Sequence, residues 1–109
     1  MPSEFRFLVF TPRELEKALV AFAIRAQKKI PMGSVKGAAI IEEEKPRAVL
    51  TIEPDSGDTV DVPFSTEEVV GSLVGMCLDR KIPLPRDHAK ALEVFQGRMA
   101  LRIQMSEMK

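Results

Sequence analysis

The sequence predicts an α+β fold: two copies of a β-α-α-β unit that share one four-stranded, mainly antiparallel sheet, with the helices on one face. Two observations predict this fold. The chain matches itself, since Phe10 aligns with Phe64, Lys29-Ile30-Pro31 with Lys81-Ile82-Pro83, and Leu50 with Leu101. Each copy also opens with a strand-like run and the same helix-capping pattern. The 109 residues are therefore expected to form a single domain, in which a β-hairpin joins two repeats, 1–54 and 55–109.

Each repeat is predicted to begin with a β-strand. In residues 4–10, and again in residues 59–64, every second residue is apolar. This alternation is typical of a strand that turns one face to the core. The alternating residues are Phe5, Phe7 and Val9 in the first repeat and Val60, Val62 and Phe64 in the second.

A helix is predicted to follow each strand, because both strands end in a capping box. Thr11 and Ser65 are the expected N-caps, and Glu14 and Glu68 lie three residues later. The first helix is expected to end before the Lys-Ile-Pro at 29–31, because a residue that precedes proline is pushed out of the α conformation. The second helix should end before the Lys-Ile-Pro at 81–83. These tripeptides are called elbows below.

The segments after the two elbows allow two interpretations. Residues 34–44 and 85–95 are compatible with a short second helix, which the threefold spacing of apolar residues in the second copy favours. The alternative is the first arm of a β-hairpin, because Gly37 weakens the first copy as a helix. Of the two, the helix is preferred.

The ends of the two repeats are predicted to be strands. Residues 47–53 and 98–104 carry the strand pattern. Residues 53–58 are rich in turn formers and lie between two strand-like runs, which predicts an antiparallel hairpin at the join of the repeats.

Charge and composition limit the classes of protein to consider. The chain has 16 Lys and Arg against 16 Asp and Glu, and this zero net charge argues against a general nucleic-acid or anionic-lipid surface. One cysteine cannot form an internal disulfide. The longest apolar run, residues 18–24, is far too short to span a bilayer, and no secretory signal precedes it. A cytoplasmic protein without a membrane segment is expected.

Basic residues around the two elbows are the candidate binding site. Arginine forks and lysines pair with carboxylates and phosphates, so these residues could bind an anion or an acidic partner. The alternative is that they lie in solvated loops and favour the C-terminal ends of the preceding helices. The candidate residues are Lys28, Lys29, Arg80, Lys81, Arg86, His88 and Lys90.

Catalytic and metal-binding patterns do not stand out. The sequence holds no glycine-rich phosphate loop, no His-Glu-x-x-His and no nucleophile elbow. His88 has no second ligand at a metal-binding spacing, and Cys77 is interpreted as a small core residue. No catalytic residue, metal or cofactor is expected, and an enzyme is the less favoured class.

Two resemblances bear on function. The second repeat, with its capped helix and the Ile-Pro-Leu-Pro at 82–85, resembles small proteobacterial proteins of no known activity that hold one such unit. This resemblance implies a fused form of a unit that otherwise pairs as a homodimer. The order of strand, capped helix and second helix also resembles a tandem ribbon-helix-helix repressor, but Asp61 would then face the DNA unfavourably.

The sequence therefore favours a non-catalytic protein-interaction or regulatory module that binds a protein partner. A DNA-binding regulator and a small-molecule or anion-binding sensor are the alternatives, and nucleic acid is the less expected ligand. The two open edges of the predicted sheet also leave homodimerisation open.

Overall fold

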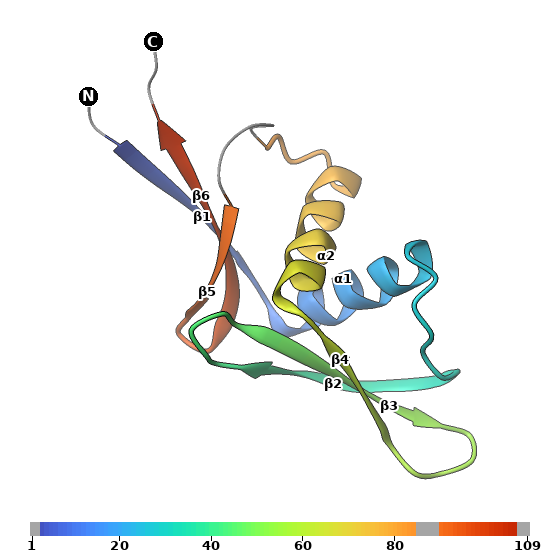
Figure 1. Ribbon diagram of the computed structural model, residues 1–109. Helices are drawn as coiled ribbons and strands as arrows, with labels where there is room; N and C mark the ends of the chain where they lie inside the picture. Colours follow the sequence, from blue (N-terminus) through green and yellow to red (C-terminus); the bar gives the residue numbers. More distant parts are fainter. Residues whose placement is uncertain (1–2, 85–89, 107–109) are drawn as a thin grey trace.

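The computed structural model describes residues 3–84 and 90–106, which form two α-helices and six β-strands (Figure 1). In chain order the elements are β1 (Ser3–Phe10), α1 (Pro12–Arg25), β2 (Gly33–Ile41), β3 (Arg47–Pro54), β4 (Val60–Phe64), α2 (Thr66–Asp79), β5 (Lys90–Phe95) and β6 (Arg98–Ser106). The α+β class is confirmed. Among the described elements, the order β-α-β-β occurs twice, so the two halves of the chain are built alike.

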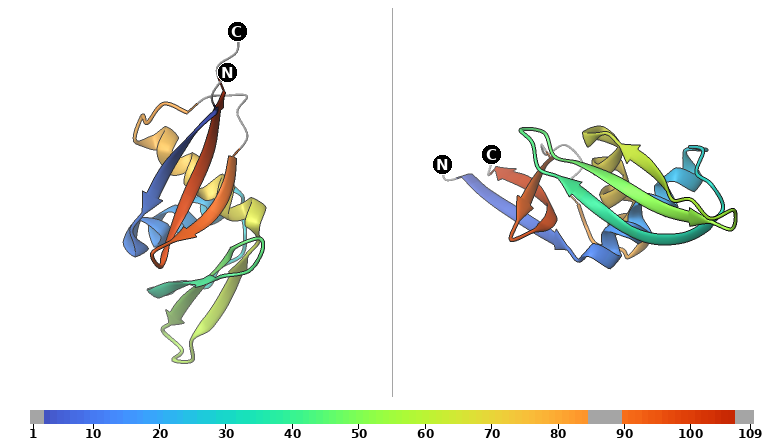
Figure 2. Two further views of the ribbon diagram at one scale, coloured as in Figure 1. Left: turned by 90° about the vertical axis from the view of Figure 1, so that its left-hand side faces the viewer. Right: turned by 90° about the horizontal axis from the view of Figure 1, so that it is seen from below.

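The six strands form two three-stranded antiparallel sheets, and the prediction of one four-stranded sheet is wrong. Sheet A has the order β1-β6-β5 and sheet B the order β2-β3-β4. Each sheet combines the first strand of one half with the hairpin of the other half, as the left view of Figure 2 shows for sheet A. The halves therefore exchange their hairpins.

The predicted second helices are also wrong. Residues 33–41 form strand β2, which pairs with β3, and residues 90–95 form strand β5, which pairs with β6. Residues 85–89 of the second predicted helix lie outside the described residues. Pairing within a hairpin satisfies the backbone hydrogen bonds of these short segments. This pairing outweighs the weak helical preference that the spacing of their apolar residues indicates. The helix that a ribbon-helix-helix order requires after α1 is thus replaced by a strand.

The two sheets share one register. Phe10 at the end of β1 pairs with Met99, and Phe64 at the end of β4 pairs with Ala48. We call two residues equivalent when they occupy the same place in the two halves, as Phe10 and Phe64 do before the hairpins and Ala48 and Met99 do within them. The same equivalence holds for all five paired residues of β4, whereas β2 departs from β5 at a register shift between Val35 and Gly37.

The sequence match places Lys29 opposite Lys81, 52 residues apart, whereas Phe10 and Phe64 are 54 apart. The backbone keeps the spacing of 54 at this place, so that Gln27 rather than Lys29 is equivalent to Lys81. Gln27 and Lys81, which are equivalent, both have a left-handed backbone conformation, with φ of 56° and 58°. The amides that follow them, of Lys28 and Ile82, close the same turn onto Ala23 and Cys77. The hairpin turns differ in length, since they span residues 42–46 in one half and 96–97 in the other.

Both helices begin at the predicted capping boxes. The Thr11 hydroxyl accepts from the Glu14 amide at 3.1 Å, and the Glu14 carboxylate accepts from the Thr11 amide at 2.8 Å. Ser65 and Glu68 make the same two bonds, at 3.2 and 2.9 Å. These bonds satisfy helix-end amides that would otherwise lack partners and fix where each helix leaves its strand.

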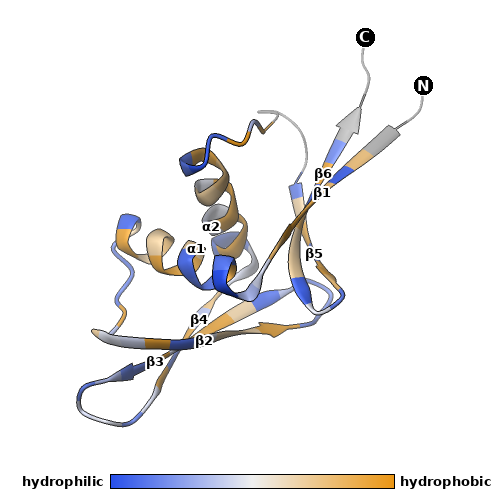
Figure 3. Ribbon diagram, turned by 180° about the vertical axis from the view of Figure 1, so that it is seen from behind, coloured by the Kyte–Doolittle hydropathy of each residue, from blue (hydrophilic) through white to orange (hydrophobic). Residues whose placement is uncertain are grey.

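The helices lie in the angle between the two sheets (Figure 1). Each helix contacts both sheets: α1 packs on β2 and β6, and α2 packs on β3 and β5. Figure 3 shows that α2 is apolar over most of its length, whereas α1 carries hydrophilic residues between its apolar ones. The core joins equivalent residues of both halves, among them Leu19 and Leu73, Leu50 and Leu101, and Ile52 and Ile103, all almost fully buried.

Neither of the two described helices has the length and apolar character that crossing a membrane requires.

Candidate functional site

Lys28 and Arg80, two of the predicted anion-binding residues, are paired within the protein. The Lys28 ammonium lies 3.2 Å from the Glu68 carboxylate and 5.1 Å from the centre of the Phe64 ring. Arg80 lies 2.7 Å from the carboxylate of Glu14. Each cation therefore connects the end of one helix to the capping glutamate of the other helix.

These contacts keep both capping glutamates ionised. The amide of Thr11 and then the guanidinium of Arg80 lower the pKa of Glu14 below its usual value of 4.5. The amide of Ser65 lowers the pKa of Glu68, and the Lys28 ammonium adds to this effect, while burial opposes it. Lys28 and Arg80 are thus largely neutralised by partners in the chain itself.

The other predicted site residues do not complete a common site with these two. Lys29 and Lys81 are exposed beyond the ends of α1 and α2. Lys90 lies at the start of β5 and lines a cleft with Lys45 and Glu67. Arg86 and His88 lie outside the described residues.

Cys77 is fully buried in α2, and burial raises the pKa of its thiol, which opposes a nucleophilic thiolate. In the described parts of the chain, no three acidic, histidine or cysteine residues lie close enough together to hold a metal ion.

The outer face of β1 is an exposed apolar surface. Phe5, Phe7 and Val9 are 51, 48 and 41% exposed, whereas Leu8 and Phe10 of the same strand turn toward the core. The sequence identified this strand, but the alternating residues that it assigned to the core face are the exposed ones. Residues 7–10 are apolar on both faces of the strand, a pattern that is also typical of strands buried on both sides, so the sequence does not show which face stays outside.

The equivalent strand β4 has a different outer face. Thr59, Asp61 and Pro63 stand at the places of Phe5, Phe7 and Val9, and the Asp61 carboxylate accepts a hydrogen bond from Thr51 at 2.9 Å. Proline and charged residues are features that protect an exposed sheet edge from pairing. Strand β1 has no such residue at these three places.

Strand β1 also lies at an edge of its sheet. It pairs along its whole length with β6 and, among the described strands, with no other. Its second edge therefore offers backbone N–H and C=O groups to a further strand.

A groove of about 190 Å³ runs between this edge and α2. Residues 7–10 of β1 form one wall, and Met76, Cys77, Arg80 and Ile82 form the other. At the outer end of β1, the Arg6 guanidinium donates a hydrogen bond to the carbonyl of Pro83 at 3.3 Å. We call this feature, together with the outer residues Phe5, Phe7 and Val9, the β1 groove.

The other half carries a lysine at one place of this groove. Lys28 is equivalent to Ile82, and its ammonium lies over the ring of Phe64, the equivalent of Phe10. The apolar Ile82 is therefore one difference between two otherwise similar halves.

No family model, no curated protein and no solved structure matches this chain.

Proposed function

We propose that this protein is a non-catalytic interaction module, and that it binds an extended segment of a partner protein as an added strand along β1. The open edge of β1 beside the groove carries the proposal. In this mode of recognition, main-chain hydrogen bonds give affinity and alternate side chains of the segment give specificity.

The groove beside β1 and the outer face of β1 could each contact one face of such a segment. Side chains on one face of the added strand would enter the groove beside Met76 and Ile82. Side chains on its other face would lie next to the half-exposed Phe5, Phe7 and Val9, since neighbouring strands bring same-face residues together. The positions that enter the closed groove, which are every second residue of the segment, are therefore expected to be apolar, while the outer positions stay partly exposed to solvent and are less restricted.

The charges of the groove favour one acidic residue in the segment. Arg80 is neutralised by Glu14, but Arg6 donates only to the uncharged carbonyl of Pro83 among the described contacts. A carboxylate of the partner near Arg6 would gain a charge-assisted hydrogen bond.

The difference between the halves also supports the proposal. We infer that the halves are diverged copies of one β-α-β-β unit, because their order of elements, register and caps agree. In such a pair, β4 keeps a protected edge while β1 has an apolar one, which is the expected result of selection for binding at β1. The anion-sensor alternative at the elbows gains no support, since Lys28 and Arg80 have internal partners.

The test is selection from a displayed library of random short peptides on the immobilised protein. We expect enriched peptides with alternating apolar residues and one acidic position, and measurable binding of the synthetic peptide by fluorescence anisotropy. Phe7→Lys should weaken this binding about tenfold, because it removes an apolar contact and places a charge at the edge.

Asp61→Lys is the matched control, because Asp61 holds the equivalent place on β4, and it should leave the affinity unchanged. Equal loss in both variants, or no enrichment of any peptide, would overturn the proposal. Enrichment of sequences like residues 3–10 of the chain itself would identify a second copy as the partner instead.

A further inference from the structure

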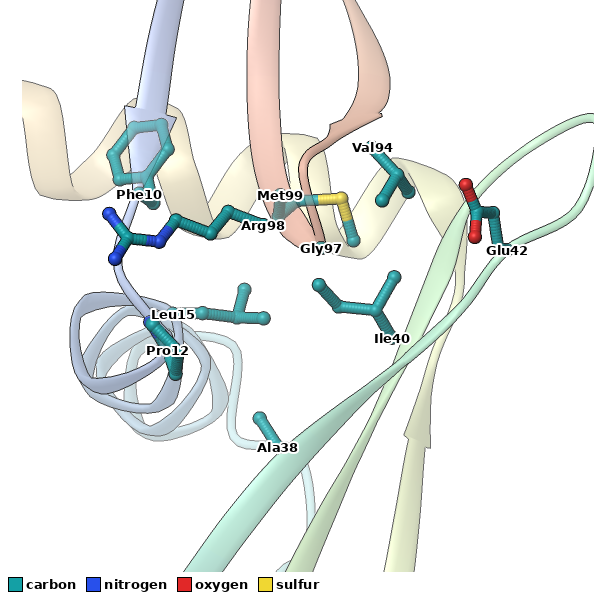
Figure 4. Close-up of a pocket in the computed structure, with 10 residues that line it drawn as sticks. All are labelled: Phe10, Pro12, Leu15, Ala38, Ile40, Glu42, Val94, Gly97, Arg98 and Met99. Carbon is teal, nitrogen blue, oxygen red and sulfur yellow. The ribbon is translucent and has the colours of Figure 1, made fainter.

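A second cavity, of about 280 Å³, lies where the ends of the two sheets meet the start of α1 (Figure 4). Leu15, Ile40 and Met99 form its walls, one each from α1, β2 and β6. Figure 4 shows Arg98 along one side, reaching toward Phe10, with Glu42 on the opposite side. We call this cavity the inter-sheet cleft; it shares only Phe10 with the β1 groove.

Among the described residues, Arg98 has no counterpart of the ion pair that its equivalent forms. Arg47, which holds the same place at the start of β3, forms a two-contact ion pair with Glu43, at 3.2 and 3.3 Å. Glu43 belongs to the long turn at 42–46, and the two-residue turn at 96–97 has no place for such a residue. Within residues 3–84 and 90–106, no carboxylate pairs with Arg98.

A cleft near the start of α2, in which Thr66 and Leu92 hold the places of Pro12 and Ala38, is differently lined. It is bordered by Thr66, Val70 and Leu92, but its rim carries Glu44, Lys45, Glu67 and Lys90. Charges of both signs there can satisfy one another. The inter-sheet cleft instead has apolar walls with one cation, Arg98, and one carboxylate, Glu42, on opposite sides, and among the described residues no ion pair joins them.

We propose that the inter-sheet cleft binds a small monocarboxylic acid with an apolar body, and that Arg98 pairs with the carboxylate. The planar guanidinium fits a carboxylate with two parallel hydrogen bonds. The apolar body of the ligand would displace water from the partly exposed Ile40 and Val94, beside Leu15 and Met99, which are already almost fully buried. This site goes beyond the proposed peptide recognition and does not depend on it.

Size and charge restrict the ligand further. A cavity of about 280 Å³ lies near the lower end of the range for small-molecule sites, roughly 300–1,000 Å³. Glu42 on the far side would repel a second anionic group. One carboxylate on a short aliphatic or single-ring body is therefore the class that fits.

The experiment is titration of the full chain with sodium octanoate and with octanamide, its neutral counterpart, by calorimetry and thermal unfolding. We expect octanoate to bind about tenfold more tightly than octanamide, and to raise the unfolding temperature more, because only the acid forms the ion pair. Arg98→Met should remove this difference, whereas the matched Arg47→Met should preserve it.

A second variant tests the cavity itself. Ala38→Leu adds apolar volume at the cleft wall, so it should abolish binding of both compounds while the chain still unfolds cooperatively. Equal affinity for the two compounds, an unchanged preference in Arg98→Met, or no binding of octanoate would overturn this proposal. None of these outcomes bears on the peptide-binding experiment. That experiment depends on the effect of substituting Phe7, which does not line the inter-sheet cleft.

Discussion

At the scale of single residues, the two capping glutamates each hold two parts of the molecule together. Glu14 closes the first turn of α1 and pairs with Arg80 at the end of α2. Glu68 closes the first turn of α2 and pairs with Lys28, beyond the end of α1. Each glutamate therefore couples the start of its own helix to the end of the other one.

We expect Glu68→Gln to cost about 1 kcal/mol of unfolding free energy near neutral pH, because it weakens a cap and removes an ion pair. The pKa of Glu68 is lowered in the folded protein, so the carboxylate stabilises the fold above its unfolded pKa near 4.5. That contribution is lost as the pH falls through the folded pKa. The difference from wild type should therefore shrink between about pH 7 and about pH 3.

Denaturant unfolding of both proteins across this pH range measures the effect. Glu67→Gln is the control, because Glu67 is the exposed neighbour in the same helical turn. A Glu68→Gln deficit that stays constant as the medium becomes strongly acidic would contradict the assigned role of the carboxylate.

The sequence predicted the caps but not the partners of the cations. A capping box is local, so Thr11 and Glu14 suffice to predict it. Pairing of Lys28 with Glu68 depends on how α1 and α2 pack, which no local pattern records. The sequence therefore offered as candidates for an external anion two cations that pair with internal carboxylates.

At the scale of elements, the hairpin turns determine how the two halves differ. In the tight turn between β5 and β6, Gln96 and Gly97 both have positive φ, at 53° and 77°. This is the backbone of a type I′ turn, which matches the twist of a two-residue hairpin. Glycine at the second position adopts it without a steric cost.

We expect Gly97→Ala to lower the unfolding free energy by about 1 kcal/mol, because a side chain at that φ is strained. Gly37→Ala is the matched control: Gly37 lies in β2, has no positive φ, and has open space where a Cβ would stand. Thermal and denaturant unfolding measure both. Equal losses in the two variants would show that turn geometry is not the cause.

The second helices were mispredicted because their segments are short and ambiguous. Over so few residues, the spacing of the apolar side chains is compatible with either a helix or a strand. Only pairing with a neighbouring strand decides between the two. Gly33 holds a further clue, since a Cβ there would collide with the backbone of Glu53 and Pro54. A close approach of two strands therefore requires glycine at that position, but the sequence does not show which backbone comes close.

At the scale of the whole molecule, the exchange of hairpins between the two halves follows from the short connection between β3 and β4. The short turn at 55–59 makes β4 pair with β3, so β4 joins the hairpin of the first half. The hairpin β5–β6 is then left for β1. The predicted hairpin between the repeats already contained the pairing of β3 with β4, but the four predicted strands were too few to show that a second sheet forms. With β2 and β5 as strands rather than helices, each hairpin builds its own sheet.

This exchange predicts how the halves behave when they are separated. Fragments 1–56 and 57–109 each lack a strand that completes a sheet, and the pairs Lys28–Glu68 and Arg80–Glu14 cross between them. Neither fragment alone should unfold cooperatively, and mixing them should restore an equimolar complex with cooperative unfolding. Native mass spectrometry and circular dichroism measure this. If each fragment instead folds as a stable monomer and mixing changes nothing, each half must close its own sheet, and the exchanged hairpins would be wrong.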